Sequence, residues 1–420
     1  MACKVSLQSL LATLIAISVA NNGNGSAQVA GRCIAYVRPA TRIPSALLHV
    51  VPMPAWEQRE LVDIAEIVGG GTPDTNNSNY WDGDIDWYAP AELGNNIYAE
   101  SSTRKITQAG FDSCSTKMLP ADKTILFTSR AGIGNTAILR HSACTNQGFQ
   151  SLVIGDADVY FVYSMSERIK KWAEEKASGS TFLEISGRQL ETMPVNLPSL
   201  VEQQAIGSFF SHLDDLITLH QRKYDKLVVF KKSMLEKMFP KDGESVPEIR
   251  FAGFTDPWEQ RKFSEIVDVC SGRDYKHLDE GPIPVYGTGG YMTSVSEALS
   301  HNRDAIGIGR KGTIDKPYLL KAPFWTVDTL FYAIPKSDIN LEFALCSFLN
   351  VDWKSKDEST GLPSLSKESI NETVLSVPNV VEQNHLGNFF ADLDRLITLH
   401  QRKLELLQNI KKSLLDKMFV

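Results

Sequence analysis

The strongest constraint on the fold is a stretch that occurs twice, as residues 201–239 and 381–419, offset by 180 residues. About 24 of the 39 aligned positions are identical, and the octamer at 216–223 recurs unchanged at 396–403. A long internal repeat of this kind indicates a duplicated architecture, so it precedes every other inference about the fold.

Apolar residues recur in both copies at heptad spacing, which predicts two long amphipathic helices. The predicted pairing residues are Phe209, Leu213, Leu216, His220 and Leu227 in the first copy, and Phe389, Leu393, Leu396, His400 and Leu407 in the second. In this assignment Leu213 and Leu227 occupy a positions, Phe209 and Leu216 occupy d positions, and an additional e row widens the stripe. A helix of this length, about 58 Å, needs a partner. We expect the other copy to be that partner; the alternative is that each helix lies on its own domain.

The two helices are predicted to pair antiparallel as a coiled coil. His220 and His400 are each the twentieth residue of their copy, so antiparallel alignment brings the two histidines together at the middle. A polar residue at an a position costs stability but fixes the register. The alternative is that each imidazole ring points into solvent.

Each long helix follows a segment of mixed secondary structure that also occurs twice. Trp56-Glu-Gln-Arg59 and Trp258-Glu-Gln-Arg261 open the two copies, and short β-rich runs with turn residues follow. One shorter helix is predicted in each copy, at 164–177 and at 341–351. The fold class is therefore α+β, with two similar domains separated by the two long helices.

The repeat also predicts where the domains begin and end. A first domain at 53–200 precedes a helix at 201–240, a Pro- and Gly-rich linker occupies 241–257, a second domain spans 258–380, and a second helix spans 381–420. Ser129-Arg-Ala-Gly132 aligns with Gly309-Arg-Lys-Gly312 at an offset of 180, whereas the openings are offset by 202. The first copy is therefore predicted to carry 22 extra residues before Arg130.

Residues 1–52 have no counterpart in the second copy. An apolar run from Leu10 to Ala20 follows Lys4, which is typical of a secretory signal but too short to span a membrane. We expect this segment to be an extension outside the fold, from an upstream start assignment; a genuine signal or anchor is the alternative. The six cysteines are scattered, which favours reduced thiols in a cytoplasmic protein with no membrane association.

The sequence carries no convincing catalytic or metal-binding constellation. Gly307-Ile-Gly-Arg-Lys-Gly312 matches a dinucleotide-binding pattern formally, but Pro317 excludes the helix that this pattern requires, so a tight turn between strands is favoured. No cysteine or histidine spacing indicates a metal site. We therefore expect that the chain catalyses nothing and binds no cofactor.

A basic residue in a glycine-flanked loop does recur, as Arg130 in the first copy and as Arg310 with Lys311 in the second. Arginine in such a loop is suited to bidentate contacts with phosphate or guanine. Further candidate DNA-binding residues on predicted loops are Asn135, Asn146, Gln147 and Tyr291. The alternative for each is ordinary loop chemistry. The net charge of -7 means that any positive potential for DNA must be local or come from partners.

The duplicated Val-Glu-Gln…Leu-Ile-Thr-Leu-His-Gln-Arg-Lys…Lys-Met-Phe helices, with the Trp-Glu-Gln-Arg openings, resemble the specificity subunit of type I restriction-modification systems. The resemblance covers about residues 53–420. The lead-in found here at Val246–Phe254 is missing before Trp56, where residues 1–52 stand instead, and this departs from the family pattern.

This resemblance implies two target-recognition domains that each recognise one half of a split, asymmetric site in double-stranded DNA, with the helices as a spacer. It also implies modification (methyltransferase) subunits, two of them, and restriction (endonuclease and translocase) subunits as partners. S-adenosylmethionine, ATP and Mg would be used by those partners. The competing interpretation is a coiled-coil scaffold protein that does not bind DNA.

Overall fold

The computed structural model describes residues 55–94, 96–130, 132–179, 183–241 and 243–419. The predicted extension at residues 1–52 lies outside this part of the chain. Of the described helices, none combines the length and the apolar character that crossing a membrane requires.

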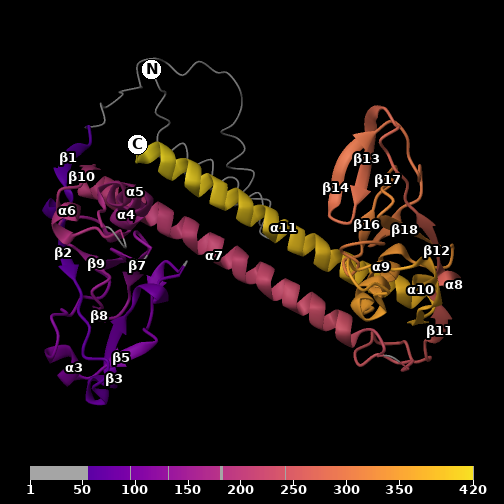
Figure 1. Cartoon of the computed structure of the whole chain (residues 1–420), viewed down its shortest axis with the longest axis horizontal. Helices are drawn as coiled ribbons and strands as arrows, with labels where there is room; N and C mark the ends of the chain where they lie inside the picture. The colour runs from indigo at the N-terminus through magenta and orange to yellow at the C-terminus, as the bar shows by residue number, and fades with distance from the viewer. Residues whose placement is uncertain (1–54, 95, 131, 180–182, 242, 420) are drawn as a thin grey trace, which may run out of the picture. The chain divides into compact units, whose positions relative to one another are not determined.

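Two long helices, α7 (Leu200–Lys237) and α11 (Val380–Met418), lie side by side (Figure 1). Each begins at a polar cap: the Ser199 hydroxyl accepts a hydrogen bond from the backbone of Glu202, and the Asn379 amide oxygen accepts one from Glu382. Such caps satisfy backbone N–H groups that have no partner inside the helix. The predicted pair of long helices is therefore confirmed.

The direction of pairing follows from contacts along the two helices. The Lys231 ammonium lies 2.6 Å from the Asp394 carboxylate, and the Lys411 ammonium lies 2.6 Å from Asp214. Because residues late in each helix meet residues early in the other, the pairing is antiparallel, as predicted. The two ion pairs are related by the 180-residue repeat and fix one register.

His220 and His400 meet at the middle of the pair, with 2.8 Å between their Nδ1 atoms. One ring must donate its Nδ1–H and the other must accept at an unprotonated Nδ1, so at least one of the two rings is neutral in this arrangement. Burial lowers the pKa of each histidine, and the nearby Lys223 and Lys403 ammonium groups lower it further.

The predicted d row is only partly buried between the helices. Leu216 and Leu396, both predicted to pair, are 38% and 44% exposed. The e row also lies at the interface, with Ile217, Tyr224 and Lys231 at half-buried positions. The e row, which was predicted to widen the apolar stripe, therefore takes part in the pairing, and its lysine adds an ion pair to it.

The other predicted pairing residues lie in or beside the packed regions. Leu213 and Leu393 are buried at 4% and 6% exposure. Phe389 is half-buried and its ring centroid lies 6.4 Å from that of Phe230. Phe209, Leu227 and Leu407 are also half-buried.

The first globule, which we define as β1 to β10, contains three small sheets with the orders β2-β9-β6-β7-β4, β5-β3-β8 and β1-β10. Its strands are β1 (Glu57–Glu60), β2 (Ala65–Gly69), β3 (Trp81–Tyr88), β4 (Tyr98–Ala99), β5 (Arg104–Ile106), β6 (Thr124–Phe127), β7 (Thr136–Leu139), β8 (Cys144–Thr145), β9 (Gln150–Ile154) and β10 (Pro194–Leu197). Its α-helices are α3 (Gln108–Asp112), α4 (Val159–Ser164), α5 (Ser166–Lys176) and α6 (Gly187–Glu191).

The second globule, β11 to β19, repeats this topology with the orders β12-β18-β15-β16, β14-β13-β17 and β11-β19. Its strands are β11 (Glu259–Lys262), β12 (Val267–Ser271), β13 (Glu280–Gly287), β14 (Gly290–Val295), β15 (Ala305–Gly309), β16 (Tyr318–Leu320), β17 (Trp325–Thr326), β18 (Leu330–Pro335) and β19 (Val374–Val377). Its α-helices are α8 (Phe263–Ile266), α9 (Leu341–Asn350) and α10 (Lys367–Glu372). The α+β fold class is confirmed.

The first globule differs mainly in the connection after β3. This connection runs from Tyr88 to Arg104 and contains β4, which pairs with β7, whereas β13 and β14 are joined by the two residues between Gly287 and Gly290. Much of the predicted 22-residue insert therefore lies here.

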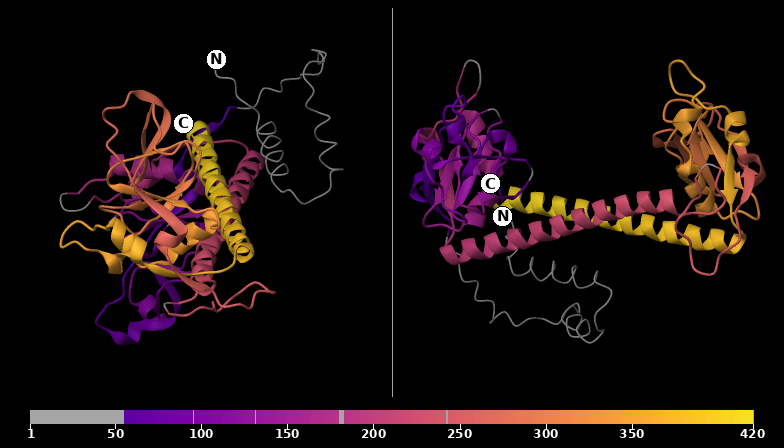
Figure 2. Two further views of the ribbon diagram at one scale, coloured as in Figure 1. Left: turned by 90° about the vertical axis from the view of Figure 1, so that its right-hand side faces the viewer. Right: turned by 90° about the horizontal axis from the view of Figure 1, so that it is seen from below.

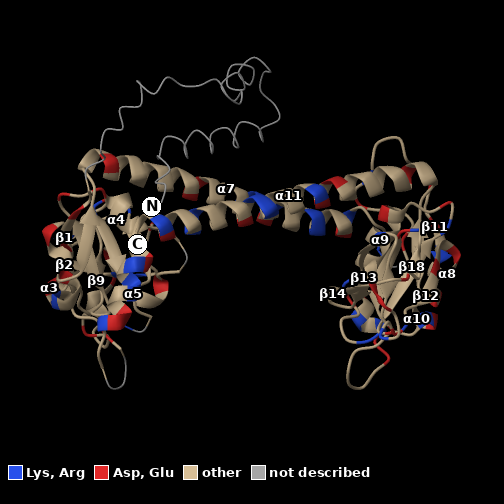
Figure 3. Ribbon diagram, turned by 90° about the horizontal axis from the view of Figure 1, so that it is seen from above, with Lys and Arg blue, Asp and Glu red and all other residues tan. Residues whose placement is uncertain are grey.

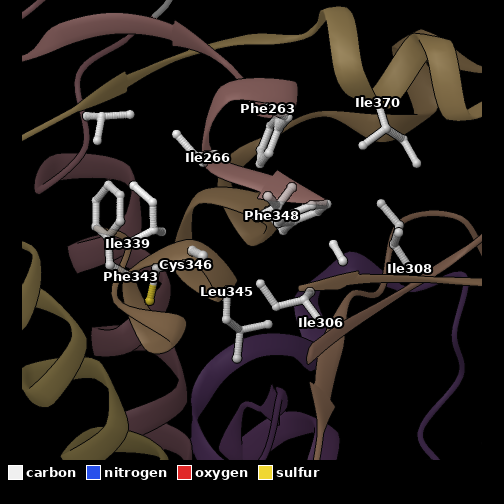
Figure 4. Packing of buried hydrophobic residues seen from close by; sticks show 14 of the residues in the cluster. Phe263, Ile266, Ile306, Ile308, Ile339, Phe343, Leu345, Cys346, Phe348 and Ile370 are labelled. Carbon is white, nitrogen blue, oxygen red and sulfur yellow. The ribbon is translucent and has the colours of Figure 1, made fainter. Parts of the chain in front are cut away.

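The ends of the long helices are part of the globule cores. Met238 and Phe239, at the end of α7, are buried in a cluster with Phe343 and Phe390, and the Phe239 and Phe343 rings are stacked at 5.7 Å. Figure 4 shows the part of this cluster contributed by α8, α9 and β15. At the other end of the repeat, Phe419 lies edge-to-face with Phe161 at 5.5 Å. The C-terminal end of each long helix therefore packs on the globule that precedes the other long helix.

Candidate nucleic-acid interface

The loop that follows β6 has the same backbone contacts as the loop that follows β15. In the first globule the Ser129 N–H donates to the Gly148 carbonyl (2.8 Å), and the Ser129 carbonyl accepts from Ile185 (3.0 Å). In the second globule the Arg310 N–H donates to the Thr329 carbonyl (2.8 Å), and the Arg310 carbonyl accepts from the Leu365 N–H (3.0 Å). Ser129 and Arg310 are therefore structurally equivalent.

The next residue in each loop bridges to the same neighbouring segment, Arg130 to Glu184 and Lys311 to Ser364. Arg130 is therefore equivalent to Lys311. The predicted alignment, which paired Arg130 with Arg310 at an offset of 180, is wrong by one residue. The paired strands that flank the loop are offset by 181, and the offset is 180 again only at Glu184 and Ser364. The second globule has an exposed arginine where the first has a buried serine.

We call the turn Asn146–Gly148, and its equivalent Val327–Thr329, the central turn. The Asn146 N–H donates to the Tyr88 carbonyl (3.0 Å), as the Val327 N–H donates to Tyr286 (3.0 Å). A glycine packs against this turn in each globule; a Cβ on Gly70 would lie 2.1 Å from the Asn146 carbonyl oxygen, and one on Gly272 would lie 2.0 Å from that of Val327. Only glycine therefore allows the residue after β2, and the residue after β12, to lie this close to the backbone of the central turn.

The predicted polar residues of the first globule gather around these turns. The Asn146 amide oxygen accepts from the Gly148 N–H (2.7 Å), and the Gln147 amide oxygen accepts from the Thr72 hydroxyl. Asn135 is exposed, and its backbone N–H donates to the Thr128 hydroxyl (2.9 Å). Arg130, Asn146 and Gln147 thus belong to one junction, formed by the loop after β6, the central turn and the segment after β2. Asn135 lies at the end of the loop after β6.

In the second globule, Arg310 and Lys311 are exposed beside the central turn, and the Arg310 guanidinium donates to the Asp328 carbonyl (3.4 Å). Tyr291, at 63% exposure, lies on β14; its ring centroid is 6.3 Å from that of Tyr286, whose strand pairs with β14 and whose carbonyl holds the central turn. The β13–β14 hairpin, which carries the exposed Tyr291 ring, is therefore joined through Tyr286 to the central turn beside Arg310 and Lys311.

Two exposed residues at this junction were not predicted from the sequence. Arg273 lies directly after Gly272, and its N–H donates to the Thr326 carbonyl (2.9 Å). Asp328 is the equivalent of Gln147. Arg273 follows the repeated glycine, and Asp328 lies in the central turn. These equivalences become visible only when the two globules are aligned correctly.

The pattern of Gly307–Gly312 is a strand followed by a tight turn, as expected. Gly307 and Gly309 lie in β15, and Gly312 has φ +90°. Within the described residues, no three His, Cys, Asp or Glu side chains are grouped as a metal site would require. Lysine and arginine alternate with acidic residues on the helices and the globules (Figure 3), in agreement with the mixed charge of the sequence.

A family model described as the type I restriction modification DNA specificity domain matches residues 53–228 and again residues 255–409. The chain belongs to this family. The two matches cover the two copies of the repeat, so the family domain itself occurs twice.

Individual specificity subunits are similar over shorter regions. The type I restriction enzyme MjaIX specificity subunit of Methanocaldococcus jannaschii is 32% identical over 231 residues, which are 52% of this chain and 52% of that protein. The EcoR124I/EcoR124II specificity subunit of Escherichia coli is 27% identical over 188 residues, which are 40% of this chain and 46% of that protein. The matched part of this chain thus spans about half the length of these relatives.

A solved structure of a type I restriction-modification system S subunit from M. genitalium has the same fold. It superimposes with a TM-score of 0.58 at 19% identity, covering 89% of this chain and 98% of that chain. The repeated domains and the paired long helices of this specificity-family chain are therefore an architecture already seen in crystals.

Proposed function

We propose that this chain is the DNA sequence-recognition subunit of a type I restriction-modification complex and that it catalyses no reaction itself. The observation that carries the proposal is the junction built twice, with the same backbone hydrogen bonds and different exposed side chains. A protein that recognises two different sequences with one scaffold needs this combination. The proposed target is a double-stranded DNA site in two separated, different parts.

The proposed division of the chain keeps the predicted boundaries. Target-recognition domains occupy residues 53–200 and 258–380, spacer helices occupy 201–240 and 381–420, and a linker occupies 241–257. Residues 1–52 are proposed to lie outside the fold.

The two cations that the globules share, Arg130 and Lys311, are proposed to contact DNA phosphates. Contacts to phosphate position the protein without selecting a sequence, so a shared residue suits this role. Arg310 occurs in one globule only and is proposed to contact a base, since arginine makes bidentate bonds to guanine in the major groove. Asn135, Asn146, Gln147 and Tyr291 are the further candidate base contacts.

The modification subunits are proposed to bind the helices through leucines that the pairing leaves exposed. Leu216 and Leu219 on α7, and Leu396 and Leu399 on α11, are each more than a third exposed. Residues three apart share one face of a helix. Because the two leucine pairs are related by the repeat, they provide two equivalent surfaces, one for each of two modification subunits.

The restriction subunits complete the proposed complex. S-adenosylmethionine, ATP and Mg are proposed to be bound by the partner subunits, with adenine methylation and ATP-driven cleavage taking place there. The contribution of this chain is the selection of the DNA site and the distance between its two parts.

A selection from random DNA duplexes, in the presence of modification subunits, tests the proposal. We expect enrichment of two short sequence blocks separated by a gap of constant length. Absence of any enriched sequence, with assembly of the partners retained, would favour the coiled-coil scaffold that does not bind DNA. The net charge of -7 gives that alternative its support.

A further inference from the structure

The linker between α7 and the second globule is bound to the first turns of α11. The Arg250 guanidinium contacts both carboxylate oxygens of Glu382, from Nε at 2.7 Å and from Nη2 at 2.8 Å. The two side chains are 10% and 1% exposed. Next to this bidentate pair, the Phe251 ring lies 5.8 Å from the His385 ring and 6.0 Å from the Phe389 ring.

The start of α7 has the same local geometry as the start of α11. The Gln203 amide donates to the Pro198 carbonyl (3.0 Å) and accepts from the Asp158 N–H (3.1 Å). In the same way, the Gln383 amide donates to the Pro378 carbonyl (3.0 Å) and accepts from the Asn340 N–H (3.0 Å).

The aromatic residues beside these helix starts also match. The rings of Phe209 and Phe210 are 5.3 Å apart at 75°, and those of Phe389 and Phe390 are 5.2 Å apart at 79°. The first copy therefore contains the equivalents of the glutamate and of the phenylalanine pair that the linker contacts in the second copy.

Within the described residues, the partners of the two glutamates differ. Glu382 is buried by Arg250, whereas Glu202 is half-exposed and forms no ion pair with any described residue. We call the residues Glu202, Ala205 and Phe209 the Glu202 surface. Ala205 replaces His385, so an aromatic contact to that ring is lost, but the carboxylate and Phe209 remain.

We infer that the Glu202 surface binds an extended segment of another polypeptide that carries an arginine followed by an aromatic residue. The arginine forms a bidentate pair with the Glu202 carboxylate, and the aromatic ring packs on Phe209. Such charge-assisted forked pairs are stronger and more selective in geometry than single hydrogen bonds. The first globule thus has a peptide-binding surface whose ligand in the second globule is the chain's own linker.

The test uses a fluorescent synthetic peptide with the sequence of residues 243–257, titrated into the full chain and followed by fluorescence anisotropy. We expect saturable binding to one site. Glu202→Gln in the chain, or Arg250→Ala in the peptide, should weaken binding by about tenfold or more, as the loss of one charged bidentate contact predicts. Glu236→Gln is the matched control, since it removes an exposed carboxylate from the same helix.

A charge exchange makes the result independent of any general loss of fold. Glu202→Arg should abolish binding of the natural peptide, and a peptide with Arg250→Glu should bind to this variant. Absence of saturable binding, or equal binding to the wild type and to Glu202→Gln, would overturn the inference.

Discussion

Asp214 is the carboxylate at which three segments meet. It is 3% exposed, accepts a hydrogen bond from the Tyr160 hydroxyl (2.8 Å), and pairs with Lys411 of the other helix. Burial and this carboxylate together raise the pKa of the Tyr160 hydroxyl, which therefore remains a donor. The contact ties the first globule, α7 and α11 to one another.

Replacing Lys411 by Met should destabilise the chain, because Asp214 would be left buried with one donor only. Removing one partner of a buried pair costs about 3 kcal/mol. Lys231→Met is the matched variant from the other copy; its partner Asp394 is 44% exposed and can be hydrated, so its cost should be below about 1 kcal/mol. Urea unfolding measures both, and equal losses would contradict the difference in burial.

The roles proposed for Arg310 and the shared cations predict different binding defects. Arg310→Ala should cost about 1 to 3 kcal/mol at a single base pair of one half-site and relax the preference there. Arg130→Ala and Lys311→Ala should weaken binding to all sequences alike and lower the salt dependence by about one counterion each. Binding competition across single-base variants of the site, at several salt concentrations, distinguishes the two. Uniform weakening by Arg310→Ala would remove its role in specificity.

At the residue scale, the sequence identified the basic loops but not their alignment. The repeat in the helices suggested that an offset of 180 continues into the globules, but the strands from β6 to β9 align with those from β15 to β18 at an offset of 181. Arg273 and Asp328 were missed for the same reason. Only the backbone hydrogen bonds of the central turn reveal which side chains are equivalent.

At the element scale, the histidine pair makes the helix interface sensitive to pH. Since folding lowers the pKa of His220 and His400 below the value of about 6.5 expected in the unfolded chain, the unfolded state binds more protons in this range. The contribution of the pair is therefore fully present above pH 6.5 and is lost as pH falls through the lower folded pKa.

We expect the unfolding free energy to decrease more between pH 7.5 and pH 5.5 in the wild type than in the double variant His220→Gln, His400→Gln. Other titrating groups contribute equally to both proteins, so the difference isolates the pair. Chemical denaturation at each pH measures it. Identical pH dependence in the two proteins would show that the histidines do not titrate within the interface.

The exposed leucines of the helices should affect assembly rather than folding. Leu216→Ser with Leu219→Ser should leave the melting temperature of the isolated chain nearly unchanged, because these side chains are already in contact with water. Co-purification should then yield one modification subunit per chain instead of two, and adding Leu396→Ser and Leu399→Ser should abolish it. Unchanged stoichiometry would place the binding surface elsewhere.

The sequence predicted the helices, their antiparallel direction and the meeting of the central residues, because equal length and heptad spacing leave few arrangements. It did not predict that the central d positions, Leu216 and Leu396, are exposed. The d and e rows both satisfy the 3.5-residue period, and at the e positions Lys231 and Lys411 form ion pairs with Asp394 and Asp214 across the interface. Ion pairs between helices leave no trace in an apolar pattern.

At the scale of the whole molecule, one chain contains the same globule and the same helix twice. Figure 2 shows the paired helices from two further directions. The α+β class and the duplicated order could be predicted from the repeat. The strand β4 and the packing of the linker on α11 could not, since within the described residues each is seen in one copy only and has no repeat to mark it.

The central claim is that each globule recognises its own part of a DNA site. Exchanging residues 56–200 for the equivalent segment of another specificity subunit, followed by selection from random duplexes with modification subunits present, tests it most directly. The account predicts that one enriched block changes while the other block and the gap stay as they are in the wild type. A change in both blocks, or in neither, would contradict it.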